Sequence, residues 1–135
     1  MTWFRTTFCA LVLCGGFAGA AQALDTSSGQ VRIEVMATGL EEPWSIGFLP
    51  DGRFLVTERD GHLTLFPAGG GAPLGRISGL PQVAAVGQGG LLDVLIPKDF
   101  AQSREVLLSY AVAQPGGGEG TAMGAGRLSE DGTRL

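Results

Sequence analysis

The sequence predicts an all-β fold of antiparallel four-stranded meanders, equivalent to about the first two blades of a β-propeller that is incomplete in this chain. Two observations predict it. From residue 44 onward, short runs of β-favouring residues alternate with Pro, Asp and Gly turn signals. An order of strand, proline, turn and strand then occurs a second time further along the chain.

The first meander is expected between Trp44 and Phe66. Its strands are the runs 44–49, 53–58 and 62–66, separated by Pro50-Asp51-Gly52 and Asp60-Gly61. In the second and third runs apolar and polar residues partly alternate, which is typical of strands. Asp-Gly pairs suit tight hairpin turns because glycine tolerates a positive φ. The pattern therefore predicts an antiparallel meander.

The same order begins again at Leu91. The run 91–96 and Pro97 correspond to the run 44–49 and Pro50, and the two prolines are 47 positions apart. The runs 106–110 and 121–128 supply the next strands. A meander that recurs after about 40–50 residues is typical of propeller blades. The alternative is a chance likeness between two hairpins of a β-sandwich.

A propeller closes a ring of typically 4–8 blades, and one repeat does not bury its apolar face without neighbours. Residues 35–135 hold material for about two blades. We therefore expect this segment to be the N-terminal portion of a longer propeller domain, truncated in this chain. Residues 24–34 are expected to form only a short lead-in to it.

The segment Met1–Ala23 has the order of a secretory signal peptide. Arg5 supplies the positive start, residues 8–21 carry no charge, and Ala21-Gln22-Ala23 offers small residues for cleavage. A retained membrane helix is one alternative, but the stretch is shorter than the ~20 apolar residues that span a bilayer. Lipoprotein processing at Cys14 is another, but a bulky leucine precedes that cysteine. We expect cleavage after Ala23 and export.

Cysteine usage and charge exclude several classes of function. Cys9 and Cys14 both lie in the expected leader, so the mature chain has no disulfide and no thiolate metal site. The formal net charge is −4 and the basic residues form no cluster, which argues against a nucleic-acid partner. No apolar stretch after the leader is long enough to span a membrane.

The segment that points to a binding site is Gly87-Gln88-Gly89-Gly90, directly before the run that starts at Leu91. Glycines on both sides of Gln88 allow a sharp turn and a close approach of a ligand to the backbone. The glutamine offers one acceptor and one donor group, which suits sugar hydroxyls or a quinone carbonyl. The alternative is a glycine-rich turn with a solvated tip, and spacing alone favours that alternative.

An ordered set of segments carries a family resemblance. The segments are Gly39-Leu40-Glu41-Glu42-Pro43-Trp44-Ser45-Ile46-Gly47-Phe48-Leu49-Pro50-Asp51-Gly52, Val56-Thr57-Glu58-Arg59, Gly87-Gln88-Gly89-Gly90-Leu91-Leu92-Asp93-Val94, Pro97-Lys98-Asp99-Phe100 and Leu108-Ser109-Tyr110. Together they resemble the N-terminal part of the soluble aldose sugar dehydrogenases that depend on pyrroloquinoline quinone (PQQ), the glucose/sorbosone dehydrogenase family. The likeness covers roughly residues 35–128.

The resemblance implies a six-bladed propeller in the bacterial periplasm, with PQQ on its axis and calcium holding the cofactor. It implies oxidation of an aldose such as glucose at the anomeric carbon. A histidine would act as general base, hydride would pass to PQQ, and a further electron acceptor would follow. Among the family's site residues, only Gln88 has a match here, to the glutamine that lines the sugar and cofactor pocket.

Departures from the family pattern concern the remaining site residues. The family's catalytic histidine lies in a His-x-x-Gly-Arg-Leu-like segment, which does not occur here, and the family's other PQQ contacts and calcium ligands follow later still. His62 is the only histidine and is expected to be a surface or edge-strand residue. Glu58, Asp93 and Asp99 have the chemical type of calcium ligands, but their strand and turn positions have simpler explanations. The run Thr57-Glu58-Arg59 at a strand end can orient groups near a propeller axis, but a solvated charge pair of Glu58 and Arg59 is the more frequent outcome. No catalytic or metal residue is therefore assigned.

Three hypotheses of different classes follow. The first is a periplasmic PQQ-dependent sugar dehydrogenase, of which this chain is an incomplete and inactive part. The second is a non-catalytic exported propeller that binds sugar or protein. The third is a short interaction domain that is complete as given. A histidine-bearing segment beyond Leu135 would separate the first two, and cooperative unfolding of residues 24–135 as a monomer would favour the third.

Overall fold

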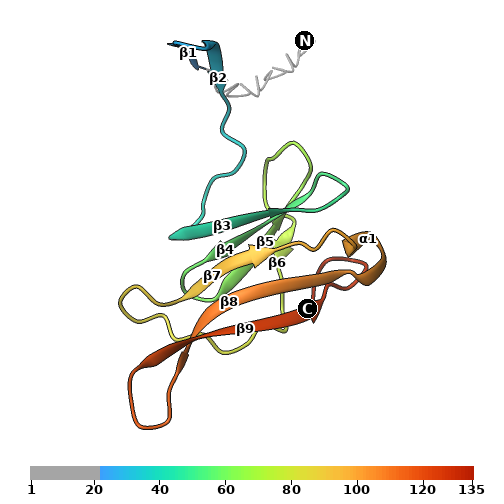
Figure 1. Cartoon of the computed structure of the whole chain (residues 1–135). Helices are drawn as coiled ribbons and strands as arrows, with labels where there is room; N and C mark the ends of the chain where they lie inside the picture. The colour runs from blue at the N-terminus through green and yellow to red at the C-terminus, as the bar shows by residue number, and fades with distance from the viewer. Residues whose placement is uncertain (1–21) are drawn as a thin grey trace, which may run out of the picture. The chain divides into compact units, whose positions relative to one another are not determined.

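The structure is a computed structural model that describes residues 22–135, with side chains from residue 24 onward. Within that range it is all-β apart from one short helix, as predicted (Figure 1). That helix is too short to cross a membrane, and the described range holds no other. The elements are β1 Gln22–Thr26, β2 Gly29–Ile33, β3 Pro43–Phe48, β4 Phe54–Glu58, β5 His62–Phe66, β6 Gly75–Arg76, β7 Leu91–Leu95, α1 Phe100–Ser103, β8 Glu105–Ala113 and β9 Glu119–Arg127.

The chain divides into two compact units at residue 34. In the first unit β1 and β2 form an antiparallel hairpin, and the hydroxyl of Thr26 donates to the carbonyl of Gly29 at 2.7 Å. The segment 24–34, expected only as a lead-in, therefore contributes to a strand pair. The predicted leader Met1–Ala23 lies outside the described residues except for its last two positions, which belong to β1.

In the second unit, the first sheet has the strand order β3-β4-β5-β6 (Figure 1). β5 coincides with the predicted run, β4 starts one residue later than predicted, and β3 starts and ends one residue earlier. The turn between β3 and β4 closes through a bond from Gly52 N to the carbonyl of Leu49 at 3.0 Å. Gly52 has a φ of +85°, so glycine suits this turn as predicted.

The second sheet has the order β7-β8-β9 and confirms the second meander. β8 and β9 are each nine residues long, longer than predicted, and α1 lies between β7 and β8 where only a turn was expected. Within residues 22–135 this sheet has three strands, which agrees with the prediction of a four-stranded meander that is incomplete in this chain. After β9 a turn at residues 129–133 directs the chain to Ser78, which forms a parallel bridge with Arg134.

The main hydrophobic core lies between the two sheets of the second unit, where β7 packs across β3 and β4. Gly47 of β3 permits this approach, because a Cβ there would lie 3.1 Å from a side-chain carbon of Ile96. The fully buried hydroxyl of Thr57 donates to the carbonyl of Leu92 at 2.6 Å and accepts from Ser45 N at 3.0 Å. One side chain of β4 thus joins β3 of its own sheet to β7 of the second sheet.

A second, smaller cluster covers the opposite face of the first sheet. Phe54, Val56 and Phe66 form it, with Ala37 and Leu40 packed against them. The rings of Phe54 and Phe66 are stacked with centroids 5.1 Å apart. As a result every residue of β4 is buried, so the strand has two apolar faces and only partial alternation.

Two exposed aspartates provide a test of the turns. The pKa of Asp131 is lowered from 3.8 by hydrogen bonds from the side chain of Ser129, which has the larger effect, and from the side chain of Thr133. The pKa of Asp51 is lowered from 3.8 by the hydrogen bond from the side chain of Arg53. Because the folded pKa is lowered, each carboxylate stabilises the fold above about pH 4, and this contribution is lost as the pH falls through the folded pKa. We expect carboxyl NMR titrations of the purified protein to give both midpoints below 3.8. A midpoint at or above 3.8 would contradict these hydrogen bonds.

Candidate functional site

Three connecting segments meet at one end of the two sheets: the segment before β3, the turn between β4 and β5, and the segment before β7. Arg59 N donates to the carbonyl of Glu42 at 3.1 Å, and Leu91 N donates to the carbonyl of Arg59 at 3.0 Å. Ala111 N donates to the carbonyl of Gly90 at 2.8 Å. The Gly87–Gly90 segment, hereafter the glutamine loop, is therefore attached to both sheets.

Glycine permits the geometry of the glutamine loop at two positions. Gly87 has a φ of +56°, which L side chains rarely adopt. Gly90 is buried, and a Cβ there would lie under 3.0 Å from the backbone of Arg59. Gln88 lies exposed at the tip, and its side chain forms no hydrogen bond with the residues that the structure describes. The predicted site residue is thus presented to solvent, with its amide available to a ligand.

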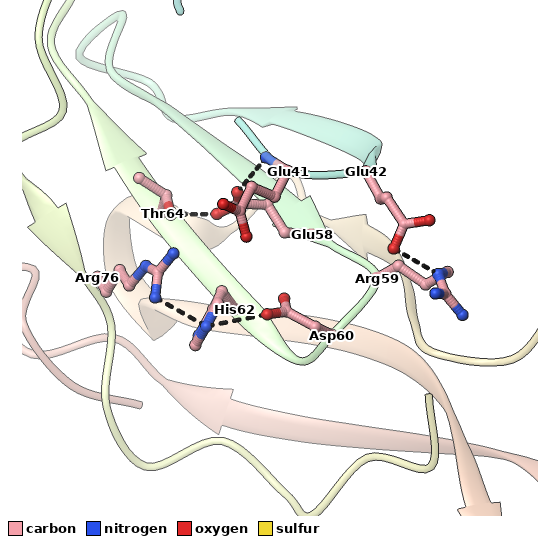
Figure 2. A network of polar contacts seen from close by, with 8 residues as sticks. All are labelled: Glu41, Glu42, Glu58, Arg59, Asp60, His62, Thr64 and Arg76. Atoms are coloured by element: carbon pink, nitrogen blue, oxygen red, sulfur yellow. Dashed lines mark hydrogen bonds and ion pairs between the residues drawn. The ribbon is translucent and has the colours of Figure 1, made fainter. Parts of the chain in front are cut away.

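Arg59 contacts the glutamine loop directly. Its Nε donates to Glu42 Oε2 at 2.8 Å, and its Nη1 donates to the carbonyl of Gly87 at 3.2 Å. Figure 2 shows the pair formed by Arg59 and Glu42 on the side of the β4–β5 turn away from His62. The expected solvated pair between Arg59 and the adjacent Glu58 is wrong, since Arg59 pairs with a residue 17 positions earlier.

Glu58 is instead buried, with 2% of its surface exposed. Its Oε2 accepts from Glu41 N at 2.8 Å and its Oε1 accepts from Thr64 Oγ1 at 2.9 Å (Figure 2). Hydrogen bonds to both oxygens compensate part of the cost of burying a carboxylate. The burial of Glu58 was predictable from the two-residue period of β4, because Glu58 shares a face with the buried residues Phe54 and Val56.

His62 begins β5, and its side chain is 37% exposed. Its Nε2 lies 3.1 Å from Asp60 Oδ2 and 2.7 Å from Arg76 Nη1 (Figure 2). It is a surface residue as expected, but β5 lies between β4 and β6, so the edge-strand alternative is wrong. The histidine is held between a carboxylate and a guanidinium, and it points toward β6 and away from Arg59.

The calcium that the family resemblance implies finds no ligand set in residues 22–135. No group of three or more His, Cys, Asp or Glu side chains in this range is arranged to hold a metal ion. Glu58 is buried against Thr64, Asp93 is an exposed residue of β7, and Asp99 is the N-cap of α1, at the other end of β7 from the glutamine loop. The exposed side-chain amide of Gln88 is suited to one polar contact with PQQ or with a sugar.

Most of the chain is similar in sequence to known proteins. Residues 40–135 match the Glucose / Sorbosone dehydrogenase family. The chain is 48% identical over 114 residues to the aldose sugar dehydrogenase YliI of Escherichia coli K12, an alignment that covers 82% of this chain and 30% of that protein. The chain therefore spans less than a third of the length of this curated relative.

Two solved structures extend the likeness to three dimensions. A crystal structure of a glucose dehydrogenase matches with a TM-score of 0.68 and 54% identity, over 72% of this chain and 28% of that one. The PQQ-bound aldose sugar dehydrogenase of Streptomyces coelicolor matches with a TM-score of 0.57 and 28% identity, over 73% of this chain and 28% of that one. The two sheets thus correspond to part of β-propeller sugar dehydrogenase structures.

Proposed function

Because the chain belongs to the Glucose / Sorbosone dehydrogenase family, we propose that it forms the N-terminal part of a PQQ-dependent aldose sugar dehydrogenase. In this proposal the glutamine loop lines the pocket for sugar and cofactor. When bound, PQQ would accept the hydride from the anomeric carbon of the aldose. The leader pattern of Met1–Ala23 supports export to the periplasm as part of the same proposal.

The observation that carries the proposal is the geometry of Gln88. The loop is held at the end of two sheets by backbone bonds, and its amide extends into solvent from a glycine turn. Connecting loops on rigid sheets are where such scaffolds place binding residues. Gln88 can donate one hydrogen bond to a quinone or sugar oxygen and accept one from a sugar hydroxyl. Gln88 thereby orients the substrate. A base outside the glutamine loop accepts the proton of the substrate.

A chimera tests this function. Residues 40–135 of this chain would replace the corresponding segment of the E. coli aldose sugar dehydrogenase, and dye-linked glucose oxidation would be measured with PQQ and calcium. We expect the chimera to be active. Gln88→Ala in the chimera should lower kcat/KM by about 10- to 100-fold, because a hydrogen bond to the bound ligand is lost.

The matched control is Gln102→Ala, which truncates an exposed glutamine of α1 at the other end of the second sheet. This control should keep kcat/KM within about twofold of the chimera. A folded chimera without activity would refute the enzymatic proposal and favour a non-catalytic sugar- or protein-binding propeller. Full activity of the Gln88→Ala chimera would remove Gln88 from the site.

A further inference from the structure

We propose that Arg59 is a positioning residue that fixes the glutamine loop, and that Glu42 holds the Arg59 guanidinium in place for this purpose. This inference rests on the proposed function and deepens it. It assigns a role to a side chain that does not touch the substrate and acts through Gln88. The geometry that carries it is a continuous series of contacts from Glu58 to Gly87.

Arg59 meets the glutamine loop at two points. Its guanidinium Nη1 donates to the carbonyl of Gly87, the residue directly before Gln88, at 3.2 Å. Its backbone carbonyl accepts from Leu91 N, directly after the loop, at 3.0 Å. Gly90 lies so close to the Arg59 backbone that only glycine fits without a shift. Arg59 therefore contacts the loop on both sides of Gln88.

Glu42 restrains the guanidinium on its other side. Glu42 Oε2 accepts from Arg59 Nε at 2.8 Å, and the Glu42 carbonyl accepts from Arg59 N at 3.1 Å. The guanidinium is planar, so a partner at Nε also orients the Nη1 that reaches Gly87. The Arg59 side chain is 28% exposed, which leaves it less accessible to competing water than Glu42 at 64%.

Glu42 itself is held in an uncommon backbone conformation. Its φ is +47°, a value that non-glycine residues adopt only when neighbouring contacts impose it. The buried Glu58 carboxylate accepts from the preceding amide, Glu41 N, at 2.8 Å, and is itself bonded to Thr64. Figure 2 shows this succession from Thr64 through Glu58 and Glu41 to Glu42 and Arg59. A buried carboxylate thus sets the direction in which Glu42 meets Arg59.

Within the loop, few other contacts fix its tip. Gly89 N donates to the carbonyl of Val86 at 2.8 Å, which closes the turn locally. Among the residues that the structure describes, the hydrogen bond from outside to Gly87 comes from Arg59. Loss of the guanidinium would leave the turn closed and the backbone bonds at Gly90 and Leu91 in place, but would remove the hydrogen bond to the residue directly before Gln88. Misplacement of a binding group by about 1 Å can cost up to 10²-fold in rate.

A double-mutant cycle in the active chimera tests the role. We expect Arg59→Ala to lower kcat/KM by about tenfold, and Arg59→Lys to recover only part of this, because lysine lacks the planar fork. If Arg59 acts through Gln88, then Arg59→Ala should cost less than about twofold once Gln88 is already alanine. Equal losses from Arg59→Ala with and without Gln88 would overturn the proposal.

Two further variants keep the test decisive. Glu42→Gln alters an exposed side chain and preserves its size, so it is expected to fold and to lower kcat/KM about threefold, again only when Gln88 is present. If the Arg59 variants do not fold, the Glu42→Gln variant tests the proposal, and an unchanged kcat/KM would refute it.

Arg53→Ala is the matched control. It removes an ion pair with Asp51 at the opposite end of β4 and should leave kcat/KM unchanged. An inactive parent chimera would instead count against the proposed function.

Discussion

The 135-residue chain, purified and supplied with PQQ and calcium, is expected to oxidise no glucose in a dye-linked assay. General base catalysis requires a group placed to accept the substrate proton, and loss of that group alone costs several orders of magnitude. The single histidine, His62, is held between Asp60 and Arg76 and points away from Arg59, the residue that contacts the glutamine loop. Residues 22–135 also present no metal-binding cluster.

The positive control for this result is the chimera with the E. coli enzyme, measured in the same assay. The chimera should turn over glucose while the separate chain remains at the level of the protein-free blank. Circular dichroism of the separate chain would establish whether its β-structure is retained. Turnover by the separate chain above the blank would show that its own residues supply a base, and His62→Ala would then identify or exclude that histidine.

Gly90→Ala is expected to be the most damaging small substitution at the site. The added Cβ would lie under 3.0 Å from the carbonyl of Arg59, which is backbone and does not move aside as a side chain does. The same carbonyl accepts from Leu91 N, so the shift would also weaken the bond that starts β7. We expect the chimera to lose about 2–3 kcal/mol in free energy of unfolding and about 100-fold in kcat/KM, measured by chemical denaturation and steady-state kinetics.

Gly120→Ala is the matched control for this substitution. Gly120 lies in β9 and its φ is outside the positive region, as at Gly90. A Cβ there would meet the amide end of Gln114, a flexible side chain that can turn away. We expect a change below about 1 kcal/mol and unaltered kcat/KM. Equal effects at both positions would show that the contact with Arg59 carries no special constraint.

Much of the fold was predictable because its signals are local. β5 coincides with the predicted run, and the prolines 47 positions apart, Pro50 and Pro97, follow β3 and β7 in the structure. The missed elements have weak local signals. α1 is only four residues long, and the bridge from Arg134 to Ser78 joins residues far apart in the sequence. The sharp turn at Gln88 was also predictable, since glycines are adjacent to it and Gly87 adopts a positive φ.

Alternation, turn residues and glycines act over a few positions, so the sequence predicted β3, β4, β5 and β7 to within one residue at each end, and a glycine turn at Gln88. It did not predict the β1–β2 hairpin. Only the tertiary structure decided the surroundings of that glutamine, which depend on contacts between distant segments. Arg59 pairs with Glu42 across 17 positions and reaches Gly87 across 28, whereas its sequence neighbour Glu58 is buried on the other side. Adjacent residues of a strand point to opposite faces, so packing between distant segments chooses their partners.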